Sequence, residues 1–207
     1  MKVLLVNGSA HKHGSTDRAL QEIEKTLHEG GIETEIFWIG NQPIGGCIGC
    51  GACGRKSSCV FGGPVAEFQE KAKQADGFVF GSPVHYAAAS GNMTSFLDRV
   101  FYSAPAETFR LKPAAVVVAA RRGGTTAAYE QLLKYPGISH MPIISSQYWN
   151  MVHGTNAADV EQDKEGLQTM RALGRNMAYF LRCLEAGRKA GVQTPEFEPF
   201  ERTNFIR

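Results

Sequence analysis

Four of the five cysteines in this chain lie within 13 residues, in a stretch that is also rich in glycine. Four thiolates in such a loop are able to ligate the irons of a [4Fe–4S] cluster. Compared with the run in bacterial ferredoxins, the last gap is longer and no proline follows it. A zinc site is the second interpretation, although its cysteine pairs usually lie further apart, and a loop of free thiols is the third. The candidate metal ligands are Cys47, Cys50, Cys53 and Cys59.

A second stretch able to do chemistry is the polar run at 8–16, which directly follows apolar residues at 3–6. Backbone N–H groups and the dipole at a helix N-terminus favour an anion, and this run adds hydroxyl and imidazole donors. The dinucleotide glycine pattern is absent, and no lysine follows Gly14 as in nucleotide-triphosphate loops. We therefore predict a cradle for one terminal phosphate, such as that of FMN, rather than an ordinary turn. Its residues are Ser9, His11, Gly14, Ser15 and Thr16.

Loops further along the chain carry residues suited to a flat aromatic ligand. Small residues at 82–91 let the backbone approach a ring, and His85 and Tyr86 offer aromatic faces; a surface loop is the alternative. An arginine pair at 121–124 would stabilise the negative charge of a reduced flavin, unless it forms a solvated turn. The aromatic stretch at 148–154 would cover a flavin or form a subunit contact. The candidate cofactor-binding residues in these loops are Ser82, Pro83, Val84, His85, Tyr86, Arg121, Gly123 and Gly124.

The sequence offers no catalytic side chain of its own. No Ser-His-Asp order, paired-carboxylate motif or HExxH motif is present, and the histidines are too dispersed to indicate a metal site. This pattern is typical of a flavoprotein, in which hydride passes from a nicotinamide to the flavin and the protein supplies geometry and electrostatics. The remaining cysteine, Cys183, is predicted to be a buried apolar thiol between Leu181 and Leu184.

Hydrophobic periodicity predicts the elements that must position these residues. Apolar runs predict strands at 3–6, 34–39, 76–81, 114–120 and 142–146. Helical spacing predicts helices at 17–29, 64–75, 92–102, 125–134 and 161–189. This alternation indicates an α/β protein with a doubly wound five-stranded parallel sheet. The carboxyl ends of strands one, three, four and five would then bring their loops to one crevice, where such sheets bind ligands.

Length and composition narrow the class of protein. The 207 residues suffice for one domain, which we place at 1–190 with an irregular cysteine-rich loop at 40–63 and a tail at 191–207. The net charge of +2 gives no basic field for nucleic acid, and no apolar run has the length of a signal peptide core or a membrane span. We therefore expect a cytoplasmic protein, where clustered cysteines favour metal or redox chemistry over disulfides.

Together these residues resemble the flavodoxin-like NAD(P)H-dependent FMN reductases, and among them the iron–sulfur flavoproteins. The resemblance covers about 1–185 and is carried by the run at 8–16, the four cysteines, and 82–91 with 95–99. It implies a three-layer α/β/α fold in which the first loop holds the FMN phosphate and the cysteine loop a [4Fe–4S] cluster. It also implies a homodimer or homotetramer. Two departures are His11 and His85, where family members often have arginine and an aromatic residue.

The expected function is that of an FMN-dependent oxidoreductase that takes electrons from NAD(P)H. The electrons would pass to a small-molecule or protein acceptor, through the cluster if the cysteines hold one. A pure electron carrier of the same fold, without a nicotinamide pocket, is the first alternative. A flavin-binding protein without enzymatic activity, whose cysteine loop holds zinc or no metal, is the second.

Overall fold

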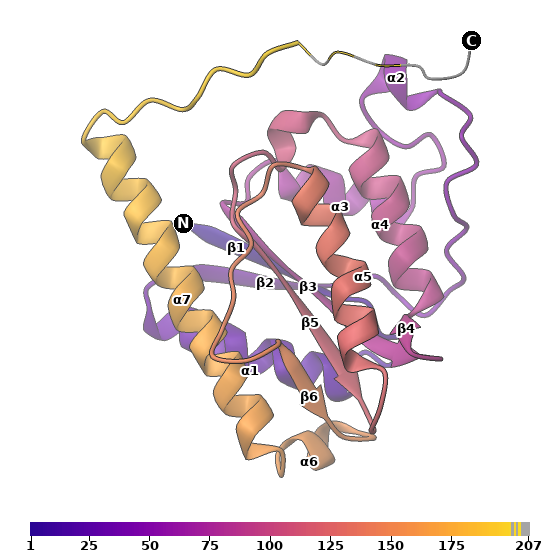
Figure 1. The fold of residues 1–207 in the computed structure, drawn as a ribbon. Helices are drawn as coiled ribbons and strands as arrows, with labels where there is room; N and C mark the ends of the chain where they lie inside the picture. Colours follow the sequence, from indigo (N-terminus) through magenta and orange to yellow (C-terminus); the bar gives the residue numbers. More distant parts are fainter. Residues whose placement is uncertain (200, 202, 204–207) are drawn as a thin grey trace.

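The computed structural model describes residues 1–199, 201 and 203, and it shows a parallel sheet between two layers of helices (Figure 1). The five parallel strands follow the order β2-β1-β3-β5-β6, the arrangement of a doubly wound flavodoxin-like sheet. A short sixth strand, β4, pairs antiparallel with the end of β3. The strands are β1 (Lys2–Asn7), β2 (Glu33–Trp38), β3 (Gly77–His85), β4 (Ala88–Ala89), β5 (Ala114–Ala120) and β6 (Met151–His153). The predicted fold class is therefore confirmed.

Helices cover both faces of this sheet (Figure 1). Helices α1 and α7 pack against each other on one face, while α3, α4 and α5 cover the other. No helix in the described part of the chain is both long and apolar enough to cross a membrane. The helices are α1 (Ser15–Glu29), α2 (Cys53–Lys56), α3 (Pro64–Ala72), α4 (Gly91–Ser103), the 3₁₀ turn η1 (Ala106–Thr108), α5 (Thr125–Ile138), α6 (Ala157–Val160) and α7 (Lys164–Lys189).

The strands are apolar on both faces because each face has its own core. Side chains alternate along β1, so Leu4 and Val6 enter the core under α3, α4 and α5 while Val3 and Leu5 enter the core under α1 and α7. The first core is strongly aromatic, with the Phe68 ring centroid 5.3 Å from that of Phe96. The two packed cores fix the positions of the strand ends from which the loops at the carboxyl edge begin.

A buried carboxylate joins α1 to α7. Glu22 accepts hydrogen bonds from Arg18 Nη2 at 2.8 Å and from Arg171 Nη1, on α7, at 2.5 Å. Burial of the Glu22 carboxyl opposes its ionisation, but the hydrogen bonds from Arg171 and Arg18 outweigh burial and lower its pKa below the ordinary value. The carboxylate therefore contributes more to stability when it is charged.

The substitution Glu22→Gln is expected to lower the free energy of unfolding by about 1–3 kcal/mol at neutral pH. Since the folded-state pKa lies below that of the unfolded chain, this contribution is fully present above pH 4.5 and is lost as the pH falls through the folded pKa. Urea unfolding of both proteins at a series of pH values measures the difference. A difference that stays constant into the acid range would contradict this assignment.

The fifth parallel strand differs from the prediction. The segment 142–146 makes only one isolated bridge, between Ile143 and Ala114 at the start of β5. The strand is β6, which pairs with Val118 to Ala120 at the other end of β5. Consequently 148–154 is not a loop after the last strand: it contains that strand, and Tyr148 and Trp149 precede it.

Three smaller predictions are also corrected. Strand β3 continues through His85 instead of ending at Gly81, so part of the expected loop at 82–91 is a β-hairpin. The predicted helix at 161–189 begins at Lys164, after the separate turn α6. Cys183 is exposed rather than buried, because Leu181 is the residue of this stretch that enters the core. Part of the predicted tail, at 200, 202 and 204–207, lies outside the described residues.

Candidate functional site

The loops after β1 and β3 are tied together at the carboxyl edge of the sheet. Gly8 N donates to the carbonyl of Gly81 at 2.8 Å, and Ser90 Oγ, at the start of α4, donates to the carbonyl of Gly8 at 3.1 Å. A Cβ on Gly8 would lie 2.6 Å from Met93 Sδ and 2.8 Å from Gly81 O. Only glycine therefore fits at the point where the predicted phosphate loop leaves the sheet.

The substitution Gly8→Ala is expected to destabilise the protein by about 1–3 kcal/mol, because the added methyl group must displace a backbone carbonyl. Thermal unfolding of this variant measures the effect. Gly123→Ala is the matched control, since a Cβ at Gly123 meets no atom within 4 Å. Equal melting temperatures for the two variants would contradict the proposed close contact.

The predicted phosphate loop is fixed by its own polar groups. Ser9 is buried, and its N–H donates to Asn7 Oδ1 at 3.0 Å. Ser9 Oγ accepts from His11 N at 3.1 Å, and the Trp38 indole N–H donates to the carbonyl of Ser9 at 2.7 Å. The Ser9 hydroxyl thus already accepts a bond within the loop, although its own proton is still free to be donated. The His11 side chain is exposed.

The first turn of α1 has features that a bound anion would satisfy. Its N-cap residue is Gly14, so no side chain caps the helix and its first N–H groups have no side-chain acceptor there. Thr16 is 1% exposed, and its hydroxyl has no hydrogen-bond partner among the residues that the structure describes. A buried unpaired hydroxyl costs about 1–3 kcal/mol, so it indicates a missing partner. The predicted cradle is therefore chemically fit for the phosphate of FMN.

Two other polar side chains of this turn have partners already. Ser15 Oγ donates to the carbonyl of Gly154 at 3.1 Å, which joins α1 to the segment after β6. The Asp17 carboxylate is buried and accepts from Gln21 Nε2 at 2.8 Å. His13 Nδ1 lies 3.2 Å from the same carboxylate. Among the predicted hydroxyl donors, Thr16 is thus better placed than Ser15 to serve a ligand.

The loop after β3 is a tight hairpin. Val84 and His85 pair with Ala89 and Ala88, and the two residues at the tip, Tyr86 and Ala87, have positive φ angles of 49° and 59°. This left-handed conformation is costly for residues with a Cβ and is concentrated at functional sites. The Tyr86 side chain is fully exposed, as the free face of a ring-binding residue must be.

The residues at the base of this hairpin are less exposed. Ser82 is buried, and its hydroxyl accepts from Ser90 N at 3.0 Å and donates to the carbonyl of Pro83 at 2.9 Å. Ser82 therefore holds the hairpin against the start of α4. Of the predicted residues in this loop, His85 and Tyr86 are the exposed ones.

The loop after β5 packs against the hairpin tip. Gly124 has a φ of +90°, and a Cβ there would lie 2.6 Å from Ala87 Cα. Arg121, Arg122 and Gly123 beside it are exposed, so their charges and N–H groups are accessible. The structure thus joins the predicted loops in pairs. The loop after β1 contacts the loop after β3, the loop after β3 contacts the loop after β5, and the start of α1 contacts the segment after β6.

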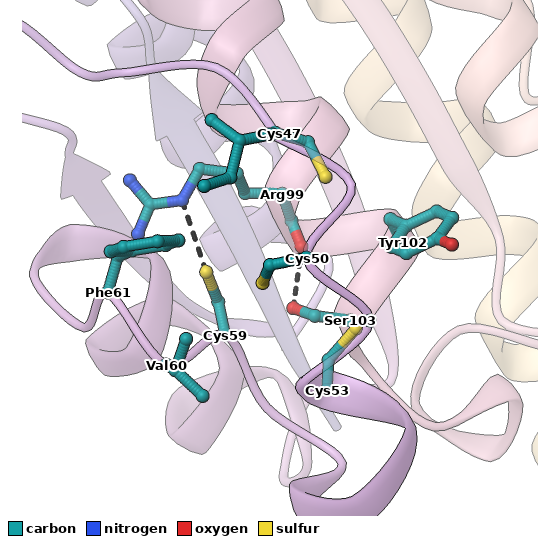
Figure 2. Close-up of a pocket in the computed structure, with 11 residues that line it drawn as sticks. Cys47, Cys50, Cys53, Cys59, Val60, Phe61, Arg99, Tyr102 and Ser103 are labelled. Carbon is teal, nitrogen blue, oxygen red and sulfur yellow. Dashed lines mark hydrogen bonds between the residues drawn. The ribbon is translucent and has the colours of Figure 1, made fainter.

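The four clustered cysteines line one pocket on the α4 side of the molecule (Figure 2). Cys47 and Cys50 are exposed, and Cys53 and Cys59 are half-buried. The loop that carries them is irregular apart from the single turn α2, as expected for 40–63. Within the described residues, no group of three or more histidine, cysteine or acidic side chains is close enough to hold a metal ion. The structure therefore brings the four predicted ligands to one pocket, but their side chains are too far apart to coordinate one metal ion together.

The pocket wall contains an arginine that belongs to no chemical motif of the sequence. Arg99, on α4, donates from Nε to Cys59 Sγ at 3.2 Å (Figure 2). In the sequence, Arg99 ends the stretch 95–99 that carries part of the family resemblance. That position did not indicate a buried role, because an arginine on an amphipathic helix usually faces solvent. Here it is only 8% exposed.

A tyrosine on the neighbouring helix adds a neutral polar group beside Cys47. Tyr135 Oη donates to Asp98 Oδ1 at 2.6 Å, and both residues line a shallow pocket with Cys47 and Tyr102. Burial of the phenol, helped by its hydrogen bond to Asp98, raises the pKa of Tyr135 well above its ordinary value. Tyr135 is therefore protonated at neutral pH and donates to Asp98.

Comparisons with known proteins cover these same segments. The family described as NADPH-dependent FMN reductase matches residues 1–156. An iron–sulfur flavoprotein of Methanocaldococcus jannaschii is 30% identical over 195 residues, which span 89% of this chain and 100% of that protein. An iron–sulfur flavoprotein of Methanosarcina thermophila is 24% identical over 192 residues, spanning 91% and 99% of the two chains.

Solved structures agree with the fold. A flavone reductase superimposes with a TM-score of 0.68 at 19% identity, over 89% of this chain and 64% of that one. An archaeal flavodoxin superimposes with a TM-score of 0.61 at 14% identity, over 88% and 99% of the two chains. The sequence match at 1–156 includes the predicted phosphate loop, the four cysteines and the loops after β3 and β5. The chain therefore belongs to the NADPH-dependent FMN reductase family, in its iron–sulfur flavoprotein branch.

Proposed function

We propose that this protein is an FMN-dependent oxidoreductase that accepts electrons from NAD(P)H and passes them to a small-molecule or protein acceptor. The observation that carries the proposal is the unsatisfied hydroxyl of Thr16 at the uncapped start of α1, a site prepared for an anion. Family membership supports the same assignment, since the matching family is described as NADPH-dependent FMN reductase.

In this proposal, the phosphate of FMN binds the amides of the first turn of α1 together with the hydroxyls of Ser9 and Thr16. The hairpin tip, with Tyr86 exposed, and Gly123 and Gly124 of the β5 loop contact the ring system. Bound FMN supplies the chemistry: it takes up hydride and can release electrons one at a time. The exposed guanidinium groups of Arg121 and Arg122 lie at the same edge and favour negative charge there.

We assign no general acid or base to this chain. In this proposal the residues at the edge of the sheet bind and orient the cofactor: the Ser90 hydroxyl holds the loop after β1, and the absence of a side chain at Gly124 lets the loop after β5 pack against the hairpin tip. The nicotinamide would stack directly on the flavin, because the sequence has no dinucleotide-binding fingerprint of its own.

The cysteine pocket is the second half of the proposal. Four thiols that line one pocket are the donor set of a [4Fe–4S] cluster. A cluster held there would relay single electrons from the flavin to the acceptor. We also propose a cytoplasmic location, because a reducing compartment keeps clustered thiols available as metal ligands rather than as disulfides.

An anaerobic preparation of the full chain tests both halves. We expect a flavin spectrum after addition of FMN, broad absorbance from an iron–sulfur cluster, and rapid reduction of the flavin by NADPH or NADH in a stopped-flow experiment. Slow reduction by both nucleotides would instead support a pure electron carrier. Zinc without iron or sulfide would support a flavin-binding protein without a relay, and no flavin binding would refute the proposal.

We also propose that the protein assembles as a homodimer or homotetramer. The support is a set of large apolar side chains that are exposed near the cysteine pocket, which is unusual for a monomer's surface. These residues are Ile48, Phe61, Tyr102 and Ile138. Light scattering at several concentrations measures the assembly, and a monomer throughout would refute this part.

A further inference from the structure

One buried arginine connects both ends of the cysteine loop. Arg99 Nη1 donates to the carbonyl of Gly45 at 3.5 Å, and Nη2 donates to the carbonyl of Gly62 at 3.1 Å. These glycines lie just outside the first and last of the four clustered cysteines, Cys47 and Cys59. One side chain on α4 thus bonds to the backbone on both sides of the segment that carries the four cysteines.

The same guanidinium also contacts a candidate ligand. Its Nε lies 3.2 Å from Cys59 Sγ, and Figure 2 shows this bond at the wall of the pocket. The planar fork of arginine presents donors in several fixed directions, so it is able to serve two carbonyls and a sulfur together. Lysine, with one ammonium group, is unable to reproduce that arrangement.

The charge of Arg99 is buried but not neutralised by these partners. Only 8% of the residue is exposed, and its acceptors are two carbonyl oxygens and a thiol sulfur rather than a carboxylate. Burying a cation is costly unless a negative group compensates it. A [4Fe–4S] cluster ligated by four thiolates carries net negative charge and would therefore compensate the positive charge of Arg99.

We propose that Arg99 is the positioning residue of the cysteine pocket, holding both ends of the loop in place and placing a compensating positive charge beside Cys59. The first role concerns the protein alone. The second rests on the proposed iron–sulfur function. Because hydrogen bonds and positive charge near the sulfurs stabilise the reduced cluster, loss of Arg99 lowers the reduction potential of any cluster that still forms.

Three variants separate these roles. R99M removes the charge and the donors but keeps an unbranched stem, and R99K keeps the charge but not the fork. R175M is the matched control, because Arg175 is an exposed arginine on α7. Trypsin cleavage of each metal-free protein after Arg55 and Lys56, mapped by mass spectrometry, reports how well the loop is held. Iron content and the midpoint potential after anaerobic reconstitution report the second role.

We expect R99M to be cleaved in the loop about tenfold faster than the wild type, and to bind about tenfold less iron at limiting iron. R99K should show fast cleavage, while its cluster keeps a potential closer to that of the wild type than the R99M cluster does. R175M should match the wild type in every measurement.

Cleavage and iron binding of R99M within about twofold of the wild type would overturn the proposal. FMN affinity reports whether each variant folds, because the flavin loops belong to β1, β3 and β5 and meet α4 near its start, at Ser90 and Met93, rather than at Arg99. If R99M does not bind FMN, R99K decides: a wild-type cleavage rate overturns the positioning role, and a faster rate supports it. If the wild type itself takes up no iron, the relay is refuted, and the cleavage arm still decides whether Arg99 holds the loop.

Discussion

Iron is expected to be lost from the anaerobically prepared protein when serine replaces any one of the four clustered cysteines. Serine is a poor ligand for iron, and the pocket offers no further thiol within the loop to take the vacant place. In the proposed iron–sulfur protein, iron should fall from about four atoms per chain toward zero, together with the broad visible absorbance that such a cluster gives. The single variants are Cys47→Ser, Cys50→Ser, Cys53→Ser and Cys59→Ser.

Cys183→Ser is the matched control for these four substitutions. Cys183 is also an exposed thiol, but it lies on α7, outside the loop. Its replacement should leave iron, sulfide and FMN content unchanged. FMN binding should also survive in the four loop variants, because the flavin loops belong to β1, β3 and β5. A loop variant that retains full iron content would remove that cysteine from the ligand set.

The affinity for FMN is expected to fall about 10- to 100-fold in Thr16→Val, which corresponds to one lost hydrogen bond to a charged group. Valine has the shape of threonine, so the packing of the Thr16 methyl group against Gly81 is kept. Because the hydroxyl has no partner in the described part of the chain, its removal should leave the free energy of unfolding of the apoprotein unchanged or raise it. Fluorescence titration with FMN and urea unfolding measure the two quantities.

Thr26→Val provides the comparison for this prediction. Thr26 lies on the same helix and is also buried, but its hydroxyl donates to the carbonyl of Glu22 at 2.9 Å. That substitution should leave FMN affinity unchanged, since Thr26 is three turns from the start of α1. Equal FMN affinities for the wild type and Thr16→Val would show that the unpaired hydroxyl does not serve the phosphate.

Much of the sheet could be predicted because its strands are covered on both faces. The run at 114–120 is apolar without interruption, and β5 has those same bounds. The last strand could not be predicted in the same way. Both 142–146 and 151–153 are short, and both touch the edge of β5, one at each end. Tertiary contacts decide which of these two short runs pairs with β5 as a strand, and the local sequence does not reveal those contacts.

The candidate site shows the same division. The chemistry of the sequence proposed the hydroxyls, the arginines and the cysteines as candidates. It did not show which hydroxyl is occupied by the protein itself. Ser15 donates to the carbonyl of Gly154, which lies 139 positions later in the chain, whereas the Thr16 hydroxyl has no partner among the described residues. The role of Arg99 was hidden for a similar reason: its acceptors lie 54, 40 and 37 positions earlier in the sequence.

The near-contact of Gly124 with Ala87 has a consequence for anyone who wishes to alter what this protein accepts. A side chain added at Gly124 would displace Ala87, whereas a Cβ at Gly123 meets no described atom within 4 Å and the Tyr86 side chain is fully exposed. A mutant library that varies Gly124 would therefore consist mostly of distorted proteins. Randomising the exposed residues of the two loops, with Gly124 retained, keeps the surface intact while its chemistry changes.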